Sequence, residues 1–351
     1  MGDATSLRSH VGKVSRLPLG ATEKRGGTFD GSGMGSRVLN LPPLPDLRGK
    51  AEIAGVLSAI EQHPQSATPL LDEAFESPKG VAIGITGPPG AGKSTLINAL
   101  IAEWRKAGLS VAVIAVDPSS TATGGALLGD RVRMRTDPND DGVFIRSVAA
   151  RGRLGGLADI VYPASVFLRA LYDRVIIESV GVGQSETDVS IVSDTVVLCI
   201  QPASGDSLQF MKAGIAEIPD VAIVTKADIG AAASRALADL KGALSLAHRE
   251  IDAWEPECFS VCVTNHSGSL GQLFAAFTRH QAWLGEKNRL TLNRNKHARS
   301  WVRSEIITQF GRRGLELVEQ GFFSSADTKP FATARRILTE FSIVHSGSVQ
   351  P

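Results

Sequence analysis

The chain has 351 residues, of which 43% are hydrophobic, and its 37 Lys and Arg residues almost balance its 36 Asp and Glu residues. This composition supports a sizeable core and gives no reason to expect a nucleic acid or a membrane as partner. Three cysteines are too few for a disulfide framework, and no apolar stretch approaches the ~18 residues that span a bilayer. We therefore expect a cytoplasmic protein in which Cys199, Cys258 and Cys262 are buried small apolar residues.

The N-terminal part of the chain divides into a tail and a helical segment. Residues 1–45 are rich in Gly, Ser, Arg and Lys without periodicity, which predicts a disordered tail. In residues 46–78, apolar side chains recur at helix spacing, which predicts two short helices. These side chains are Ile53, Val56, Leu57 and Ile60 before Pro64, and Leu70, Leu71 and Phe75 after it.

Short apolar runs alternate with amphipathic segments through residues 79–284. The runs are VAIGIT, VAVIAVD, VFIRSV, RVIIES, TVVLCI, VAIVTK and CFSVCV. This alternation predicts an α/β domain with a mostly parallel sheet of about seven strands and helices on both faces. Residues 285–351 are helical and charged in pattern, for example RSWVRSEIITQF at 299–310 and ATARRILTEF at 332–341. We expect this C-terminal extension to mediate packing or oligomer contacts rather than chemistry.

The sharpest motif is GPPGAGKST at positions 87–95, which fits the pattern G-x-x-x-x-G-K-[ST] of the P-loop NTPases. A predicted strand precedes it and a predicted helix follows it, which is the arrangement that the loop requires. Backbone N–H groups would surround the phosphates, Lys93 would bind the β- and γ-phosphates, and the Ser94 hydroxyl would face Mg²⁺. The expected nucleotide contacts are Gly87, Pro88, Pro89, Gly90, Ala91, Gly92, Lys93, Ser94 and Thr95.

Two carboxylates follow buried apolar runs, at the edge where open α/β sheets bind their ligands. Asp117 follows VAVIAV, and Glu178 follows VII. Because Mg²⁺ on two phosphates takes hard oxygen ligands from strands beside the loop, both residues are candidate metal ligands. The alternative for each is a strand-end carboxylate that caps the next helix. Asp130, in LLGD, could approach the same ion from a loop, although its spacing alone is a weak argument.

Residues 178–181, ESVG, resemble the D-x-x-G element of GTPases with glutamate in place of aspartate. Gly181 would offer a backbone N–H to the γ-phosphate, so that loss of this phosphate releases the loop that follows. The next residues, from Gly183 to Glu186, would then act as a switch, and Gln184 is a candidate catalytic residue.

The string TKAD at positions 225–228 follows the predicted strand VAIVT and fits the [NT]-K-x-D pattern of guanine recognition. Asp228 can accept hydrogen bonds from N1–H and the 2-amino group of guanine, a pair of donors that adenine lacks. Thr225 and Lys226 complete this loop. Thr264 and Asn265, after the last predicted strand, are weaker candidates for a second base-side loop.

Taken together, these motifs resemble the MeaB/ArgK family, SIMIBI-class GTPases associated with cobalamin-dependent acyl-CoA mutases. The resemblance covers residues 46–345 and is carried by GPPGAGKST, VDPSS followed by GGALLGDRVRM, FIRS, VIIESVGVGQSE and TKAD. It implies GTP or GDP with Mg²⁺ as cofactors. It further implies an adenosylcobalamin-dependent acyl-CoA mutase as partner, with a role in gating cofactor loading and in protecting or reactivating that mutase.

The resemblance also implies roles for individual residues. The Mg²⁺ sphere would contain Ser94, Asp117, Asp130 and Glu178. A third switch would contain Gly205, Asp206 and Lys212, with Lys212 sensing the nucleotide or activating hydrolysis. Lys93, Gln184, Asp206 and Lys212 are then the candidate catalytic residues. The C-terminal helices in 285–351 would form a homodimer contact.

The sequence departs from the family pattern in two places, and two other functions stay open. Thr225 stands where the family usually has Asn, and VTNHSGSLG stands for the usual SA-x-x-G region, so contacts by Thr264 and Asn265 are uncertain. A metallochaperone GTPase would need a His-rich tract, but the seven histidines are scattered. A transport-linked P-loop kinase could use Arg131, Arg133 and Arg135 as a lid, although a solvated helix face explains them as well.

Overall fold

The structure of this chain is a computed structural model. It describes residues 41–47, 49–118, 134, 137–150, 161–179, 185–202, 215–247, 249–250, 252–263, 269–321 and 328–346. Most of the predicted tail lies outside these ranges.

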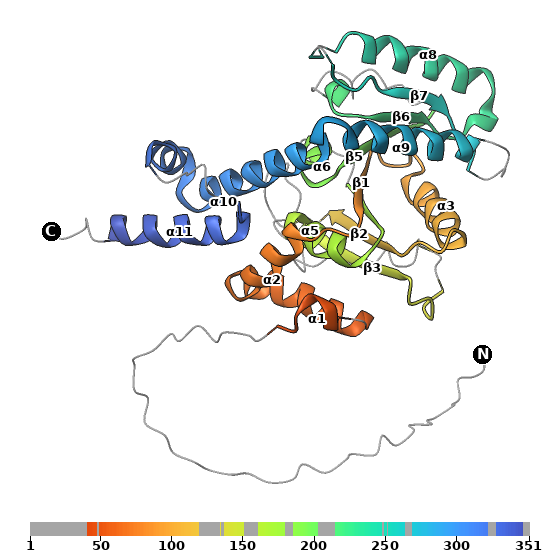
Figure 1. Ribbon diagram of the computed structural model, residues 1–351. Helices are drawn as coiled ribbons and strands as arrows, with labels where there is room; N and C mark the ends of the chain where they lie inside the picture. Colours follow the sequence, from red (N-terminus) through yellow and green to blue (C-terminus); the bar gives the residue numbers. More distant parts are fainter. Residues whose placement is uncertain are drawn as a thin grey trace, which may run out of the picture. The chain divides into compact units, whose positions relative to one another are not determined.

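A seven-stranded sheet in the order β3-β2-β4-β1-β5-β6-β7 forms the centre of the fold (Figure 1). The strands are β1 (Val81–Thr86), β2 (Val111–Pro118), β3 (Val143–Ala150), β4 (Arg174–Glu178), β5 (Thr195–Ile200), β6 (Val221–Val224) and β7 (Glu257–Ser260). Every neighbouring pair is parallel. The prediction of an α/β fold with about seven mostly parallel strands is therefore confirmed. We call the side where the strands begin the amino edge and the side where they end the carboxyl edge.

Alternate residues along the strands are buried against different helices, because successive side chains point to opposite faces of a sheet. On one face, strand residues such as Ala82 and Ile177 pack in the apolar cluster of α1, α2, α5 and α6, and Leu198 packs with α8. On the other face, Ile83 and Ile176 pack in the cluster of α3 and α9. The sheet is covered on both faces, as the apolar runs predict.

The helices follow the predicted pattern at both ends of the chain. Their bounds are α1 (Lys50–Gln62), α2 (Pro64–Glu76), α3 (Lys93–Lys106), α5 (Val161–Leu171), α6 (Ser185–Val192), α8 (Ala231–Ser245), α9 (Ser269–Gly285), α10 (Arg289–Gly321) and α11 (Pro330–Ser346). Short 3-10 turns occur at Leu44–Asp46, Ile215–Glu217, Ala227–Ile229 and Glu286–Asn288. His63, whose φ of −138° is not helical, separates the two N-terminal helices. Pro64 is the first residue of α2, a position at which its missing N–H is tolerated.

The C-terminal helices α10 and α11 lie side by side and share an apolar cluster of their own (Figure 1). Its buried members are Val302, Ile306, Leu315, Val318, Ala334, Ile337 and Phe341. Gly311 interrupts the helical backbone of α10 with a φ of 72°, a conformation that glycine adopts without strain. At the start of α11, the carboxylate of Asp72 accepts hydrogen bonds from the N–H groups of Phe331 and Ala332 at 3.0 Å each, which ties α11 to α2.

A buried cluster of charges ties α10 to the sheet at the amino edge. Asp194, just before β5, accepts hydrogen bonds from Nε of Arg294 at 2.8 Å, a second nitrogen of Arg294 at 2.7 Å and the N–H of Ala82 at 2.8 Å. Arg169 of α5 donates to the same carboxylate at 3.3 Å. Burial alone would raise the pKa of Asp194, but the hydrogen bond from Arg294 and the charge of Arg169 outweigh it and lower the pKa to about 2.

A second buried group at the amino edge surrounds His280 of α9. Its Nδ1 lies 2.9 Å from Oγ1 of Thr195, and its Nε2 lies 3.3 Å from Oδ1 of Asp220. Trp254 and Trp283 pack on the imidazole, with ring centroids 4.9 and 5.6 Å away. Burial lowers the pKa of His280 to about 4 and raises the pKa of Asp220 to about 7, so the histidine is neutral at neutral pH.

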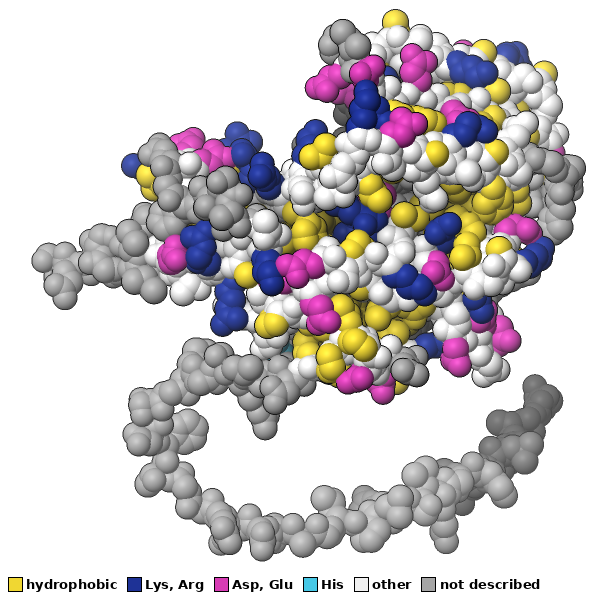
Figure 2. All heavy atoms as spheres, in the orientation of Figure 1, with side chains coloured by type: hydrophobic (Ala, Val, Ile, Leu, Met, Phe, Trp, Pro, Cys, Tyr) yellow, Lys and Arg dark blue, Asp and Glu magenta, His cyan; other side chains and the backbone are white. Residues whose placement is uncertain are grey.

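Figure 2 shows basic and acidic side chains interspersed over this face of the molecule. No helix in the described part of the chain is both long enough and apolar enough to cross a membrane.

Candidate functional site

Three glycines give the phosphate loop its shape between β1 and α3. Gly87, Gly90 and Gly92 have φ angles of 132°, 78° and 84°, in the region that residues with a side chain rarely adopt. A Cβ on Gly87 would lie 1.9 Å from the backbone oxygen of Cys199 in β5, so no side chain fits there. The strand–loop–helix context that the motif requires is present, and the loop lies at the carboxyl edge.

Lys93, the first residue of α3, is buried and points back into the loop. Its Nζ donates hydrogen bonds to the backbone oxygens of Gly87 at 2.7 Å and Pro88 at 3.2 Å. These contacts hold the ammonium inside the curve of the loop. Phosphate oxygens placed in that curve would accept hydrogen bonds from this cation and from the backbone N–H groups around it.

The side chains of Ser94 and Glu178 meet beside this loop. Oγ of Ser94 donates a hydrogen bond to Oε1 of Glu178 at 3.1 Å, although 84 positions separate the two residues. Glu178 is buried at the end of β4, which lies between β1 and β2. Ser179 fixes this strand end by donating from its N–H to Ile85 at 3.0 Å and from its hydroxyl to Thr86 at 2.9 Å.

These oxygens fit a magnesium ion chemically. A hydroxyl and a carboxylate at hydrogen-bond distance are hard donors of the kind that Mg²⁺ takes together with phosphate oxygens. Asp117 lies two positions beyond Ala115, the β2 residue that pairs with Glu178, so its backbone is at the same edge. Ser94 and Glu178 would hold the ion, and Asp117 stays a predicted ligand at the same edge.

Several other predicted residues lie outside the described ranges. They are Asp130, Gly181, Gln184, Asp206, Lys212, Thr264 and Asn265, together with Arg131, Arg133 and Arg135.

The predicted base-side loop follows β6 and is linked to the phosphate loop through Thr225. The Thr225 hydroxyl lies 2.7 Å from the backbone oxygen of Ala91 and 3.1 Å from that of Ile200. Thr225, which stands where the family usually has asparagine, therefore donates a hydrogen bond to the phosphate loop. Lys226 has a left-handed φ of 53°, and its Nζ donates to Oε1 of Gln201 at 2.7 Å.

Asp228 lies on the 3-10 turn after β6 with an exposed side chain. Its neighbour across the loop is Cys262, just after β7, whose Sγ lies 3.5 Å from Oδ1 of Asp228. The sequence interpretation missed this contact and took all three cysteines for buried apolar residues. That expectation is right for Cys199, which is fully buried, and wrong for Cys258 and Cys262, which are half-buried.

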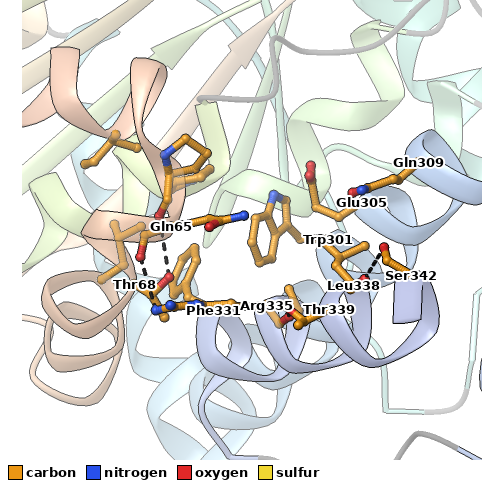
Figure 3. A pocket seen from close by; sticks show the side chains of 15 residues that line it. Gln65, Thr68, Trp301, Glu305, Gln309, Phe331, Arg335, Leu338, Thr339 and Ser342 are labelled. Carbon is orange, nitrogen blue, oxygen red and sulfur yellow. Dashed lines mark hydrogen bonds between the residues drawn. The ribbon is translucent and has the colours of Figure 1, made fainter. Parts of the chain in front are cut away.

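A separate pocket of about 470 Å³ lies among α2, α10 and α11 and contains none of the predicted site residues. Figure 3 shows Trp301 at its centre, between Gln65 and Thr68 on one side and Glu305 and Gln309 on the other. Within the described part of the chain, no group of three or more His, Cys, Asp or Glu side chains is placed to hold a metal ion.

Comparisons with known proteins agree with this arrangement. A Pyrococcus abyssi protein whose name includes the word GTPase is 38% identical over 299 residues, which cover 82% of this chain and 91% of the relative. The mitochondrial methylmalonic aciduria type A homolog of Caenorhabditis elegans is 37% identical over 236 residues, 65% of this chain and 59% of that protein. Among solved structures, a LAO/AO transport system kinase superposes with a TM-score of 0.59 at 25% identity, covering 86% of this chain and 96% of that one.

The family model described as methylmalonyl Co-A mutase-associated GTPase MeaB matches residues 51–314. This range includes the phosphate loop, Glu178, the TKAD loop and most of α10. The chain therefore belongs to the MeaB family of GTPases.

Proposed function

We propose that this chain is a GTP-hydrolysing chaperone of an adenosylcobalamin-dependent acyl-CoA mutase, methylmalonyl-CoA mutase or a related enzyme. In this role it gates loading of the cofactor and protects or reactivates the mutase. The observation that carries the proposal is the match of residues 51–314 to the mutase-associated family. The proposed location is the cytoplasm.

In the proposed reaction, water attacks the γ-phosphorus, the bond from that phosphorus to the β–γ bridging oxygen breaks, and GDP and inorganic phosphate leave. Mg²⁺, when bound, would neutralise charge on the β- and γ-phosphates. Lys93 supports this step because its ammonium lies inside the phosphate loop, where it can donate to oxygens that gain charge.

The remaining proposed roles are binding of the metal, binding of the base and sensing of the γ-phosphate. Ser94, Asp117, Asp130 and Glu178 would bind or orient the metal. Thr225, Lys226 and Asp228, with Thr264 and Asn265, would bind the base. Gln184, Asp206 and Lys212 remain candidates for sensing the γ-phosphate or assisting hydrolysis. Gly181 would report the presence of this phosphate to the loop that follows.

We also propose that residues 285–351 form a homodimer contact, with 79–284 as the GTPase domain and 46–78 as an N-terminal helical segment. Large apolar side chains on α10 support the contact, because Leu292, Ile307 and Leu317 are 59%, 40% and 41% exposed. The shared cluster of α10 and α11 gives this segment an apolar core of its own.

The likeness to a transport system kinase gives a second candidate function, transfer of the γ-phosphoryl group to an acceptor other than water. GTP labelled in the γ-phosphate separates the two functions. A hydrolase places the label in inorganic phosphate, whereas a kinase places it in the acceptor.

The mutase role is tested by measuring phosphate release from GTP by the full chain alone and with purified mutases that differ in their acyl-CoA substrate. We expect slow release by the chain alone and faster release with its own mutase. A Lys93→Ala variant is the control for contaminating activity. If no adenosylcobalamin-dependent mutase binds the chain or changes its rate, the proposed partner is wrong, while GTP hydrolysis by the chain alone would still stand.

A further inference from the structure

A cysteine lies beside the carboxylate of the base-side loop because of how β6 and β7 end. The N–H of Val261 donates to the backbone oxygen of Val224 at 2.8 Å, and the N–H of Ala227 donates to the oxygen of Val261 at 3.3 Å. This pairing makes the next residues, Asp228 and Cys262, neighbours. The thiol of Cys262 donates to Oδ1 of Asp228 at 3.5 Å, an ordinary distance for a hydrogen bond from sulfur.

We propose that Cys262 is a positioning residue for guanine specificity: its thiol holds the Asp228 carboxylate in the orientation that accepts both guanine donors. The inference rests on the proposed binding of guanine nucleotides by this chain. Asp228 is exposed, so burial does not restrict its rotation. A carboxylate oxygen has two acceptor positions, so Oδ1 can accept the thiol and a guanine N–H at once.

The contact also makes the base side of the site sensitive to alkylation of one thiol. Burial raises the pKa of Cys199 to about 12 and also raises the pKa of Cys258, which disfavours reaction at both. The Cys258 thiol faces the backbone oxygen of Pro256 at 3.7 Å. When Cys262 adds to N-ethylmaleimide, a sulfur–carbon bond forms and the thiol proton moves to the neighbouring carbon. The bulky product would stand against Asp228.

The first test compares the affinity of the full chain for fluorescent analogues of GDP and IDP in the wild type, Cys262→Ala, Cys262→Ser and Cys258→Ala. Inosine keeps the N1–H group but lacks the 2-amino group. We expect Cys262→Ala to weaken GDP binding about 3- to 10-fold, the effect of one ordinary hydrogen bond, because the thiol is a weak donor, and to weaken IDP binding less. Cys262→Ser, which keeps a donor, and Cys258→Ala should bind GDP like the wild type.

The second test follows alkylation by N-ethylmaleimide with peptide mapping by mass spectrometry. With GDP and Mg²⁺ present at about 100 times the Kd, we expect modification of Cys262 to slow by about tenfold or more. The rate at Cys258 should not change, which controls for a general effect of the nucleotide. ADP at the same concentration should protect neither residue.

The inference is overturned if Cys262→Ala binds GDP like the wild type, if it weakens GDP and IDP equally, or if GDP leaves the alkylation rate of Cys262 unchanged. In each of these cases the wild type still binds GDP, so the proposed function survives. A wild-type chain that does not bind GDP would overturn the proposed function and this inference together.

Discussion

Both edges of the sheet bury charged side chains, but the charges at the two edges meet different kinds of partner. At the amino edge, Asp194 lies between two arginine side chains and a backbone N–H, all supplied by this chain. At the carboxyl edge, Lys93 of α3 and Glu178 at the end of β4 lie beside a glycine-shaped loop whose geometry suits phosphate and a cation. The amino edge holds the fold together, and the carboxyl edge provides the candidate nucleotide site.

The pKa values also differ between the two edges. Large shifts occur at the amino edge, where the pKa of Asp220 is raised to about 7 and that of His280 is lowered to about 4 by burial. Strongly perturbed pKa values are often used to find active sites, although structural charge networks also produce them. In this chain, Asp220 and His280 have such values at the edge of the sheet opposite the candidate nucleotide site.

The largest effect that separates the two edges is expected for Asp194→Asn. In this variant an NH₂ group replaces one of the two carboxylate oxygens that accept hydrogen bonds. Arg169 and Arg294 are then buried without a counter-charge. We expect the free energy of unfolding to fall by about 3–5 kcal/mol. Urea denaturation at neutral pH, in a buffer without nucleotide, measures this loss.

A matched change at the surface controls for the loss of an ion pair as such. Glu340→Gln breaks the pair that Glu340 forms on α11 with Arg336 at 3.2 Å, where both side chains are exposed. This variant should lose less than about 1 kcal/mol. A loss of similar size in Asp194→Asn would contradict the view that the amino edge is a stabilising cluster.

At the carboxyl edge, Glu178→Ala is expected to impair function more than folding. Loss of the carboxylate 3.1 Å from Ser94 removes a proposed oxygen ligand of the metal. We expect GTP hydrolysis to fall about 100-fold, equivalent to about 2.7 kcal/mol, and the Mg²⁺ concentration for half-maximal rate to rise. Phosphate release is measured over a Mg²⁺ titration. Glu178→Gln, which keeps the shape, should show the same loss, whereas wild-type rates in both variants would return Glu178 to a purely structural role.

How much the sequence predicts also differs between the edges. At the carboxyl edge, the short motifs GPPGAGKST and TKAD predict the phosphate loop and the loop that contains Thr225. They can do so because the backbone geometry of such loops needs particular residues at fixed spacing. At the amino edge, Asp194 meets Arg169 from 25 positions away and Arg294 from 100 positions away, and no local pattern records such a pairing. The fold follows from hydrophobic alternation, which is why the seven strands could be predicted.

The contact of Cys262 with Asp228 is a third case, for which the local sequence gives only a weak indication. It lies two residues after the end of β7, the strand next to the one that precedes TKAD, so its position at the carboxyl edge could have been anticipated. The residue type argued against a role, because cysteines without a partner motif are most often small buried apolar residues. Only the pairing of Ala227 with Val261 places the thiol next to Asp228.

A smaller effect is expected where the two loops of the carboxyl edge meet. Thr225→Val keeps the shape of the side chain but removes the hydroxyl that bonds the oxygens of Ala91 and Ile200. We expect a loss of about 1–2 kcal/mol, divided between folding and GDP affinity, because the carbonyl of Ala91 is left without this donor. Urea denaturation with and without GDP separates the two contributions. Thr225→Ser restores the hydroxyl and should recover most of the loss. An unchanged GDP affinity and stability in Thr225→Val would show that the loops are coupled by other contacts.

The last effect concerns the pH dependence of stability at the amino edge. Burial raises the folded-state pKa of Asp220 to about 7, so between pH 4 and 7 the folded chain holds a proton that the unfolded chain has released. Stability from this group is therefore lost as the pH rises through 7. His280, with its pKa lowered to about 4, acts in the opposite direction, because between pH 4 and 6.5 the unfolded chain binds the extra proton.

Asp220→Asn should uncover the contribution of His280, because the amide resembles the protonated carboxyl and can still accept the N–H of Val196, which lies 2.8 Å from Asp220. The variant should gain stability relative to the wild type as the pH rises from 5 to 7, with a slope of at most about 1.4 kcal/mol per pH unit, the value for one proton. Urea denaturation of both proteins at several pH values gives this difference. Three other charges act on the pair and are present in both proteins, so their effects cancel; they are Arg249, Asp194 and Glu257. A difference that stays constant with pH would mean that Asp220 is ionised throughout this range. The 3.3 Å contact would then join an ionised carboxylate to the imidazole of His280, which would make the amino edge more like the Asp194 cluster than its burial suggests.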